Sequence, residues 1–152
     1  MIRYEPMTTE EEWRWIEARA HPIMCADTQG IVAYAENGRI LAMCVADSFT
    51  TDSCSVHLAI DNPSVIRRGF LAVVATHLFE TCNRKRIFGL VPSNNAKALR
   101  FDVKIGFREV ARIPDAIRDG VDYVVLRMDK EKCRWLKRED KDGQRDRSAE
   151  AA

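Results

Sequence analysis

The chain has 152 residues, of which 46% are hydrophobic and 31% are charged, and its formal net charge is +1. This length suits one domain with one sizeable core, and the near-zero net charge argues against nucleic acid or an anionic membrane as a partner. No apolar run reaches the roughly 18 residues of a transmembrane helix. No apolar stretch follows residues 1–6, as it would in a signal peptide.

The cysteine pattern predicts reduced thiols rather than a metal site. The five cysteines are odd in number, and no two have Cys-x-x-Cys spacing. A zinc site and a disulfide framework are therefore not expected. Free cysteines are usually buried, so the sequence predicts partly buried thiols in a cytoplasmic protein without a bound metal.

A first helix is predicted over residues 9–20. Thr9 and Glu12 have the spacing of a capping box, in which each side chain binds the backbone of the other. Ile16 continues the apolar positions at helical spacing, and Pro22 lies just beyond the predicted end.

A short leading strand at residues 2–4 would precede this helix, and further strands follow the helix. Asn37-Gly38 between two apolar runs is a strong hairpin signal, because both central turn residues need positive φ. The pattern predicts an antiparallel meander of three strands at residues 30–35, 40–46 and 54–60.

The periodicity then changes to that of a helix with one buried face over residues 65–82. The apolar run 87–91 reads as a buried strand, so strand, helix and strand form a βαβ unit with parallel strands. A second helix opens near Asn95 and ends at Gly106. Two further strands are predicted at residues 107–113 and 121–128.

The last part of the chain differs in composition. Residues 129–138 predict one more helix, and residues 139–152 are polar, mixed in charge and without apolar periodicity. We expect one domain over residues 1–128, then this helix, then a disordered tail.

One strand–helix junction is a candidate anion site. A helix that starts near Ser64 offers free backbone N–H groups at the positive end of its dipole, and Arg67 and Arg68 add charge. Together these groups could bind a pyrophosphate. The alternative is an ordinary helix start with two solvated arginines.

The segment from Asn95 through Ala98 to Gly106-Phe107 resembles a motif of the GNAT family of acetyl-CoA-dependent N-acetyltransferases. The order of predicted elements over residues 1–128 is similar as well. The resemblance implies an α/β fold with a mixed, mostly antiparallel sheet of six to seven strands, a central parallel βαβ unit and flanking helices. The 61–70 junction and residues 131–136 resemble small GNAT-like proteins often encoded by phages.

The resemblance also implies chemistry: an acetyl group would pass from acetyl-CoA directly to a primary amine, without a metal. The strand 56–60 would bind the pantetheine arm, and the loop 64–70 would cradle the pyrophosphate. The residues expected to bind the cofactor are Leu58, Ala59, Ile60, Ser64, Ile66, Arg67, Arg68, Gly69, Phe70, Asn95, Ala98 and Phe101.

An amine that is protonated at neutral pH must lose a proton before it attacks a thioester, so a base is needed. His57 lies on the proposed cofactor strand and is of a residue type that titrates near neutrality. Asp61 is the second acid/base candidate. His77 on an apolar helix face and His21 at a helix end are expected to be structural.

Two departures from the family pattern bear on catalysis. The phosphate loop has Gly69 as its only glycine, so the backbone has less freedom to approach phosphates. Asp102 stands where many members carry a tyrosine that protonates the leaving thiolate, and Tyr34 or Tyr123 would have to substitute. The short connection before residue 30 suggests an open acceptor side that suits a protein or peptide amine.

Two other functions compete with acetyl transfer. A protein of this fold could have lost turnover and serve as a binding or virion-associated component, as the incomplete phosphate loop suggests. The basic run Arg84-Lys85-Arg86 suggests nucleic-acid binding as another function, but the net charge of +1 disfavours it. A homodimer is left open.

Overall fold

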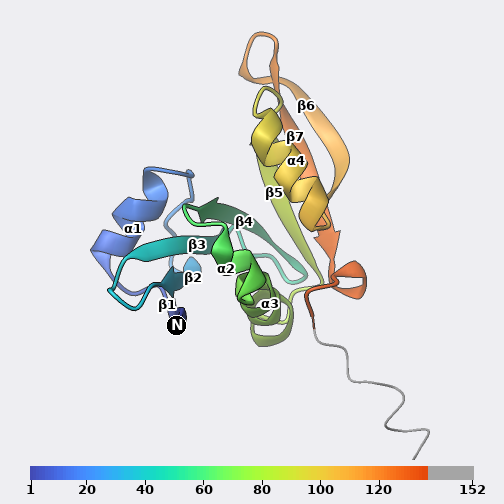
Figure 1. The fold of residues 1–152 in the computed structure, drawn as a ribbon. Coiled ribbons are helices and arrows are strands. Elements are labelled where there is room, and N and C mark those ends of the chain that lie inside the picture. The colour runs from blue at the N-terminus through green and yellow to red at the C-terminus, as the bar shows by residue number, and fades with distance from the viewer. Residues whose placement is uncertain (137–152) are drawn as a thin grey trace, which may run out of the picture.

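The structure is a computed structural model that describes residues 1–136, and its strands form one seven-stranded sheet (Figure 1). The strand order is β1-β2-β3-β4-β5-β7-β6. Only β4 and β5 pair in parallel, and every other neighbouring pair is antiparallel. The strands are β1 (Arg3–Pro6), β2 (Gln29–Tyr34), β3 (Ile40–Asp47), β4 (Ser53–Ile60), β5 (Arg86–Pro92), β6 (Arg108–Arg118) and β7 (Val121–Asp129).

Helices cover both faces of this sheet. The helical elements are α1 (Glu10–Glu17), α2 (Ser64–Arg67), α3 (Phe70–Ala75), the π-helix η1 (Thr76–Thr81), α4 (Ala96–Ile105) and the 3₁₀ turn η2 (Lys130–Lys132). Ile16 of α1 packs with Met43 and Val45 in one buried cluster, whereas Phe70 of α3 belongs to a second cluster with the α4 residue Ile105. The predicted fold class, a mixed α/β sheet with flanking helices, is confirmed.

The capping box predicted for the first helix is present. Thr9 Oγ1 accepts from the backbone N–H of Glu12, while the Glu12 carboxylate accepts from the backbone N–H groups of Thr8 and Thr9 at 2.7 and 3.2 Å. Tyr34 of β2 also donates its hydroxyl to Glu12 Oε1 at 2.6 Å. Although burial alone would raise the pKa of Glu12, these hydrogen bonds hold it below its usual value. The helix itself ends at Glu17, three residues before its predicted end.

We expect Glu12→Gln to lower the free energy of unfolding by about 1 kcal/mol at pH 7, because hydrogen bonds to a charged acceptor become bonds to a neutral one. Since the folded-state pKa of Glu12 is lowered, this stabilisation is present above its unfolded-state pKa and fades as the pH falls. Thermal melts at pH 7 and in acid measure the difference. Glu11→Gln, on an exposed neighbour, is the matched control, and equal melting temperatures for both variants at pH 7 would contradict the prediction.

The prediction of one continuous helix over residues 65–82 is wrong. The segment forms α2, a break, and then α3 and η1. Gly69 causes the break, because its φ of 91° lies in the left-handed region that a continuous right-handed helix excludes. The apolar periodicity continues across the break, so the pattern alone predicted one helix.

The helix predicted over residues 129–138 is also wrong for the residues described. Only the 3₁₀ turn Lys130–Lys132 forms, and Cys133 then leaves it in extended conformation. Cys133 is 1% exposed, and Trp135 donates its indole N–H to the carbonyl of Ile105 at 2.7 Å. Packing against the end of α4 therefore takes precedence over local helix propensity. The disordered tail predicted over residues 139–152 lies outside the described residues.

No helix within residues 1–136 is both long and apolar enough to cross a membrane.

Candidate functional site

The parallel strands β4 and β5 pair at one end only. Their register joins Ser53 to Arg86, Cys54 to Ile87 and Ser55 to Phe88, and it stops there. Beyond Ser55 the two strands diverge, as Figure 1 shows. On its other side β4 stays paired with β3 up to Ile60. Within the described residues, the backbone groups of 56–60 that point away from β3 therefore have no strand partner.

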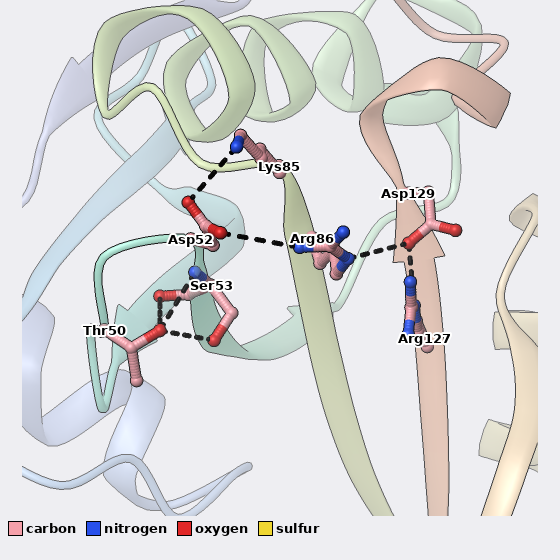
Figure 2. A network of polar contacts seen from close by, with 7 residues as sticks. All are labelled: Thr50, Asp52, Ser53, Lys85, Arg86, Arg127 and Asp129. Atoms are coloured by element: carbon pink, nitrogen blue, oxygen red, sulfur yellow. Dashed lines mark hydrogen bonds and ion pairs between the residues drawn. The ribbon is translucent and has the colours of Figure 1, made fainter.

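A cluster of charged side chains joins the strands at their paired end (Figure 2). Asp52 lies 3.6 Å from Lys85 Nζ and 3.7 Å from Arg86 Nη1, and its carbonyl accepts from the backbone N–H groups of both residues. Arg86 also approaches Asp129 at the end of β7, which accepts from Arg127 at 2.7 Å. These contacts fix the ends of β4, β5 and β7 together, so the divergence beyond Ser55 starts from a fixed point.

His57 is in the unpaired half of β4. It pairs with Val45 in the β3–β4 register, and its side chain is 23% exposed. Nε2 lies 2.8 Å from Oδ2 of Asp47, the last residue of β3, although the two groups are not aligned for a straight hydrogen bond. The Asp47 side chain is only 2% exposed. His57 thus combines partial exposure with a buried anionic neighbour.

Asp61, the second predicted acid/base residue, is held by Arg19. The guanidinium donates to both carboxylate oxygens at 3.0 and 2.9 Å, and the same guanidinium lies 3.7 Å above the ring of Trp15. Asp61 also lines a hollow of about 330 Å³ together with Tyr34 and Arg39. The pair with Arg19 ties the end of α1 to the end of β4 beside this hollow.

The predicted phosphate loop has fewer free backbone N–H groups than a loop without helical structure would have. Because α2 forms within it, the N–H groups of Ile66, Arg68 and Gly69 donate to nearby carbonyls, and the N–H of Ser64 donates to the side chain of Asn62. The remaining candidates are the first N–H groups of α3, which starts at Phe70. Among the described residues, no contact is seen to the exposed guanidinium of Arg67.

Tyr4 of β1 fixes the position of this loop. Its hydroxyl donates to the carbonyl of Arg68 at 2.8 Å, and its ring stacks on that of Phe70 with 6.2 Å between centroids. Phe70 is fully buried, so its side chain belongs to the core and only its backbone remains available to a ligand. Leu58 and Ile60 likewise pack against the core cluster that contains Phe70.

Helix α4 carries the second predicted group of cofactor residues. Asn95 is its N-cap and accepts from the N–H of Ala98 at 3.2 Å, and Gly106 ends the helix with a φ of 119°. Ala98 and Phe101 are partly buried against the core. The start and end expected for this helix are confirmed, and their contact with a cofactor stays a prediction.

Asp102, on the same helix, differs from the ionised aspartate that the sequence suggested. Burial raises its pKa to about 6, and no hydrogen bond or ion pair to its carboxyl is found in residues 1–136. About a tenth of this carboxyl is therefore protonated at pH 7, which is far more than at the ordinary pKa of an aspartate, although most of it remains ionised. The phenol of Tyr34, in contrast, is engaged with Glu12, and burial and this carboxylate raise its pKa.

Sequence reasoning missed Asp47 and Arg19 as partners of the site. An aspartate that ends an otherwise apolar strand was a visible signal, because a buried carboxylate needs partners. The identity of its partner depends on the β3–β4 register, which periodicity does not give. Within residues 1–136 there is also no gathering of three or more histidine, cysteine, aspartate or glutamate side chains that could hold a metal.

Comparison by sequence and comparison by structure give different results for this chain. No family model and no curated protein matches the sequence. The structure is similar to a mutant form of the spermidine/spermine N-acetyltransferase SpeG from Vibrio cholerae, with a TM-score of 0.70 and 12% identity over 87% of this chain and 96% of that one.

A structure from Desulfovibrio desulfuricans, described as an acetyltransferase of the GNAT family, is similar at a TM-score of 0.68 and 13% identity, over 86% of this chain and 99% of that one. Vibrio cholerae SpeG with manganese ions matches at a TM-score of 0.69 and 12% identity, over 86% and 94% of the two chains. These similarities lend no support to the resemblance to phage proteins. At such identities they show the architecture, and the chain has the GNAT fold.

Proposed function

We propose that this protein is an N-acetyltransferase that moves an acetyl group from acetyl-CoA to a primary amine. The observation that carries the proposal is the divergence of β4 and β5, which leaves the backbone edge of residues 56–60 unpaired beside His57. An extended ligand with amide groups, such as a pantetheine arm, can hydrogen-bond to such an edge as an added strand would.

The neighbouring charges suit the rest of the cofactor. The α2–α3 junction follows β4 directly and carries Arg67 and Arg68, both exposed. The first N–H groups of α3 and these guanidinium groups would bind the pyrophosphate. Ala98 and Phe101 on α4 are assigned to the pantetheine side of the site.

The chemistry requires two proton movements. The amine nitrogen attacks the thioester carbonyl carbon, an amide bond forms, and the C–S bond breaks to release CoA as a thiolate. We assign the amine proton to His57, directly or through water. We assign the protonation of the thiolate to Asp102, whose pKa of about 6 keeps part of the carboxyl in its acid form.

The acceptor is proposed to be a primary amine that enters from the face of α1. Asp61 is assigned to the acceptor hollow rather than to proton transfer, because Arg19 occupies both of its oxygens. SpeG is named for spermidine and spermine, which makes these polyamines the first acceptors to test. The exposed side chains of Ile23 and Met24 on the adjacent loop favour peptide amines as the second class.

Acetyl-CoA should raise the melting temperature of the protein in a saturable way, because a ligand that binds only the folded state stabilises it. The double variant Arg67→Ala, Arg68→Ala should raise the dissociation constant for acetyl-CoA by about tenfold, since charge-assisted contacts to phosphate are lost. Arg14→Ala, an exposed arginine on α1, is the control and should bind normally. Absence of any shift at millimolar acetyl-CoA would refute the proposal.

A second candidate is a binding protein of this fold without turnover. The specific observation in its favour is that Ile66, Arg68 and Gly69 use their N–H groups within α2 and its end. Release of CoA thiol from acetyl-CoA with a panel of polyamines and peptides separates the two functions. Binding without release across the panel would favour this second candidate.

A further inference from the structure

We propose that Asp47 is a positioning residue for His57: its buried carboxylate engages Nε2 of the imidazole, so that Nδ1 is the nitrogen that accepts the proton. The inference rests on the proposed function for the proton step, but the geometry it claims can be tested without turnover.

The contact joins the end of β3 to the middle of the neighbouring strand β4. Asp47 pairs with Ser55 in the β3–β4 register, two residues from the pair of Val45 with His57. The side chains of Asp47 and His57 are therefore diagonal neighbours on one face of the sheet. Oδ2 of Asp47 lies 2.8 Å from Nε2, and the Asp47 side chain is 2% exposed. The two groups are close but not aligned in the structure, so the proposed hydrogen bond requires a rotation of the imidazole about χ2, a torsion with a broad minimum.

A buried carboxylate accepts hydrogen bonds and donates none. In the neutral imidazole, the proton therefore belongs on Nε2, where the carboxylate accepts it, and the lone pair belongs on Nδ1. When Nδ1 takes a proton, the adjacent carboxylate stabilises the imidazolium that forms, as in other aspartate–histidine pairs. The 23% exposure of the His57 side chain leaves a route for a substrate proton or a water.

The same carboxylate oxygen also holds the loop that follows α1. The backbone N–H of Ile23 donates to Asp47 Oδ2 at 2.7 Å. Ile23 and Met24 expose their side chains by 59% and 56% beside this contact. One buried anion thus orients the proposed base and positions the loop on the proposed acceptor side.

The test uses the full-length protein labelled with ¹⁵N at histidine. In the wild type, the ring nitrogen shifts of His57 should show the Nε2–H tautomer. Asp47→Asn removes the charge but can keep an oxygen where Oδ2 accepts from Ile23 and faces Nε2, whereas Asp47→Ala removes the acceptor as well, so the Nε2–H fraction should fall in Asp47→Ala. The value of kcat should drop by about tenfold or more, and KM for acetyl-CoA should change by less than about twofold. Asp27→Asn, an exposed aspartate in the same loop, should change none of these quantities.

Two results would overturn the proposal. One is a wild-type His57 in the Nδ1–H tautomer, and the other is an unchanged tautomer and kcat in Asp47→Ala. Should that variant fail to fold, the wild-type tautomer alone decides. A protein that transfers no acetyl group but shows the Nε2–H tautomer, lost in Asp47→Ala, would refute the proposed function and retain the pairing.

Discussion

His57→Ala should lower kcat for acetyl transfer by about 100- to 10,000-fold while the protein stays folded, because general base catalysis contributes factors of this size. His57 is the histidine in the unpaired half of β4, 2.8 Å from a buried carboxylate and partly open to solvent. The KM for acetyl-CoA should change little, since the pantetheine is proposed to contact the backbone of β4 rather than the imidazole. Steady-state release of CoA thiol with the best acceptor of the panel measures both constants.

His21→Ala is the matched control for this variant. His21 is an exposed histidine on the loop after α1, so the same substitution there should leave kcat near the wild-type value. Partial recovery of His57→Ala by added imidazole would support a proton-transfer role. An unchanged kcat in His57→Ala would remove His57 from catalysis and leave the acetyltransferase proposal to other evidence.

Local sequence signals predicted those parts of the fold that are determined locally. The capping box of Thr9 and Glu12, the hairpin at Asn37-Gly38 and the αL cap at Gly106 each involve residues within a few positions of one another. In the hairpin, Gly38 has a positive φ of 84°, whereas Asn37 lacks the positive φ that the sequence predicted for both turn residues. Each such signal has a steric or hydrogen-bonding cause that acts regardless of the rest of the chain. The antiparallel meander and the parallel pair of the βαβ unit then followed from the order of the elements, whereas the place of β7 between β5 and β6 did not.

The errors arose where distant residues decide the outcome. Gly69 was recognised as a loop residue, yet periodicity ran through it, and only its φ of 91° separates α2 from α3. Residues 133–136 have helical periodicity, but Trp135 instead hydrogen-bonds to Ile105 thirty positions away. Long-range packing of this kind overrides propensity.

The candidate site shows the same division. His57 was predicted from its residue type and its strand, whereas its partner Asp47 is fixed by a register that pairs Val45 with His57. Arg19 as the partner of Asp61 joins positions 42 residues apart. The residue types proposed for the site could therefore be predicted from the sequence. The contacts between those residues and distant partners, such as Asp47 with His57, could not.

Asp102→Asn should stabilise the protein by about 2–3 kcal/mol at pH 8, because a carboxylate there is ionised in a partly buried place where residues 1–136 offer it no hydrogen bond or ion pair. Burial raises the folded-state pKa of Asp102 to about 6 from the ordinary 3.8, and a shift of about two pKa units corresponds to about 3 kcal/mol. Between these two values the folded state binds more protons than the unfolded state, so this group makes the wild type less stable as the pH rises. The substitution removes that cost and keeps the shape of the side chain.

The pH dependence distinguishes this explanation from a general effect of the substitution. Below about pH 3 the carboxyl is neutral in both states, so Asp102→Asn and the wild type should unfold at the same denaturant concentration. The difference should grow through pH 5 and level off above about pH 6.5. Asp27→Asn, an exposed aspartate, should show no such dependence. If Asp102 also protonates the leaving thiolate, the more stable variant will have a lower kcat with unchanged acetyl-CoA binding. A stabilisation that is equal at pH 3 and pH 8 would contradict burial of the charge as its cause.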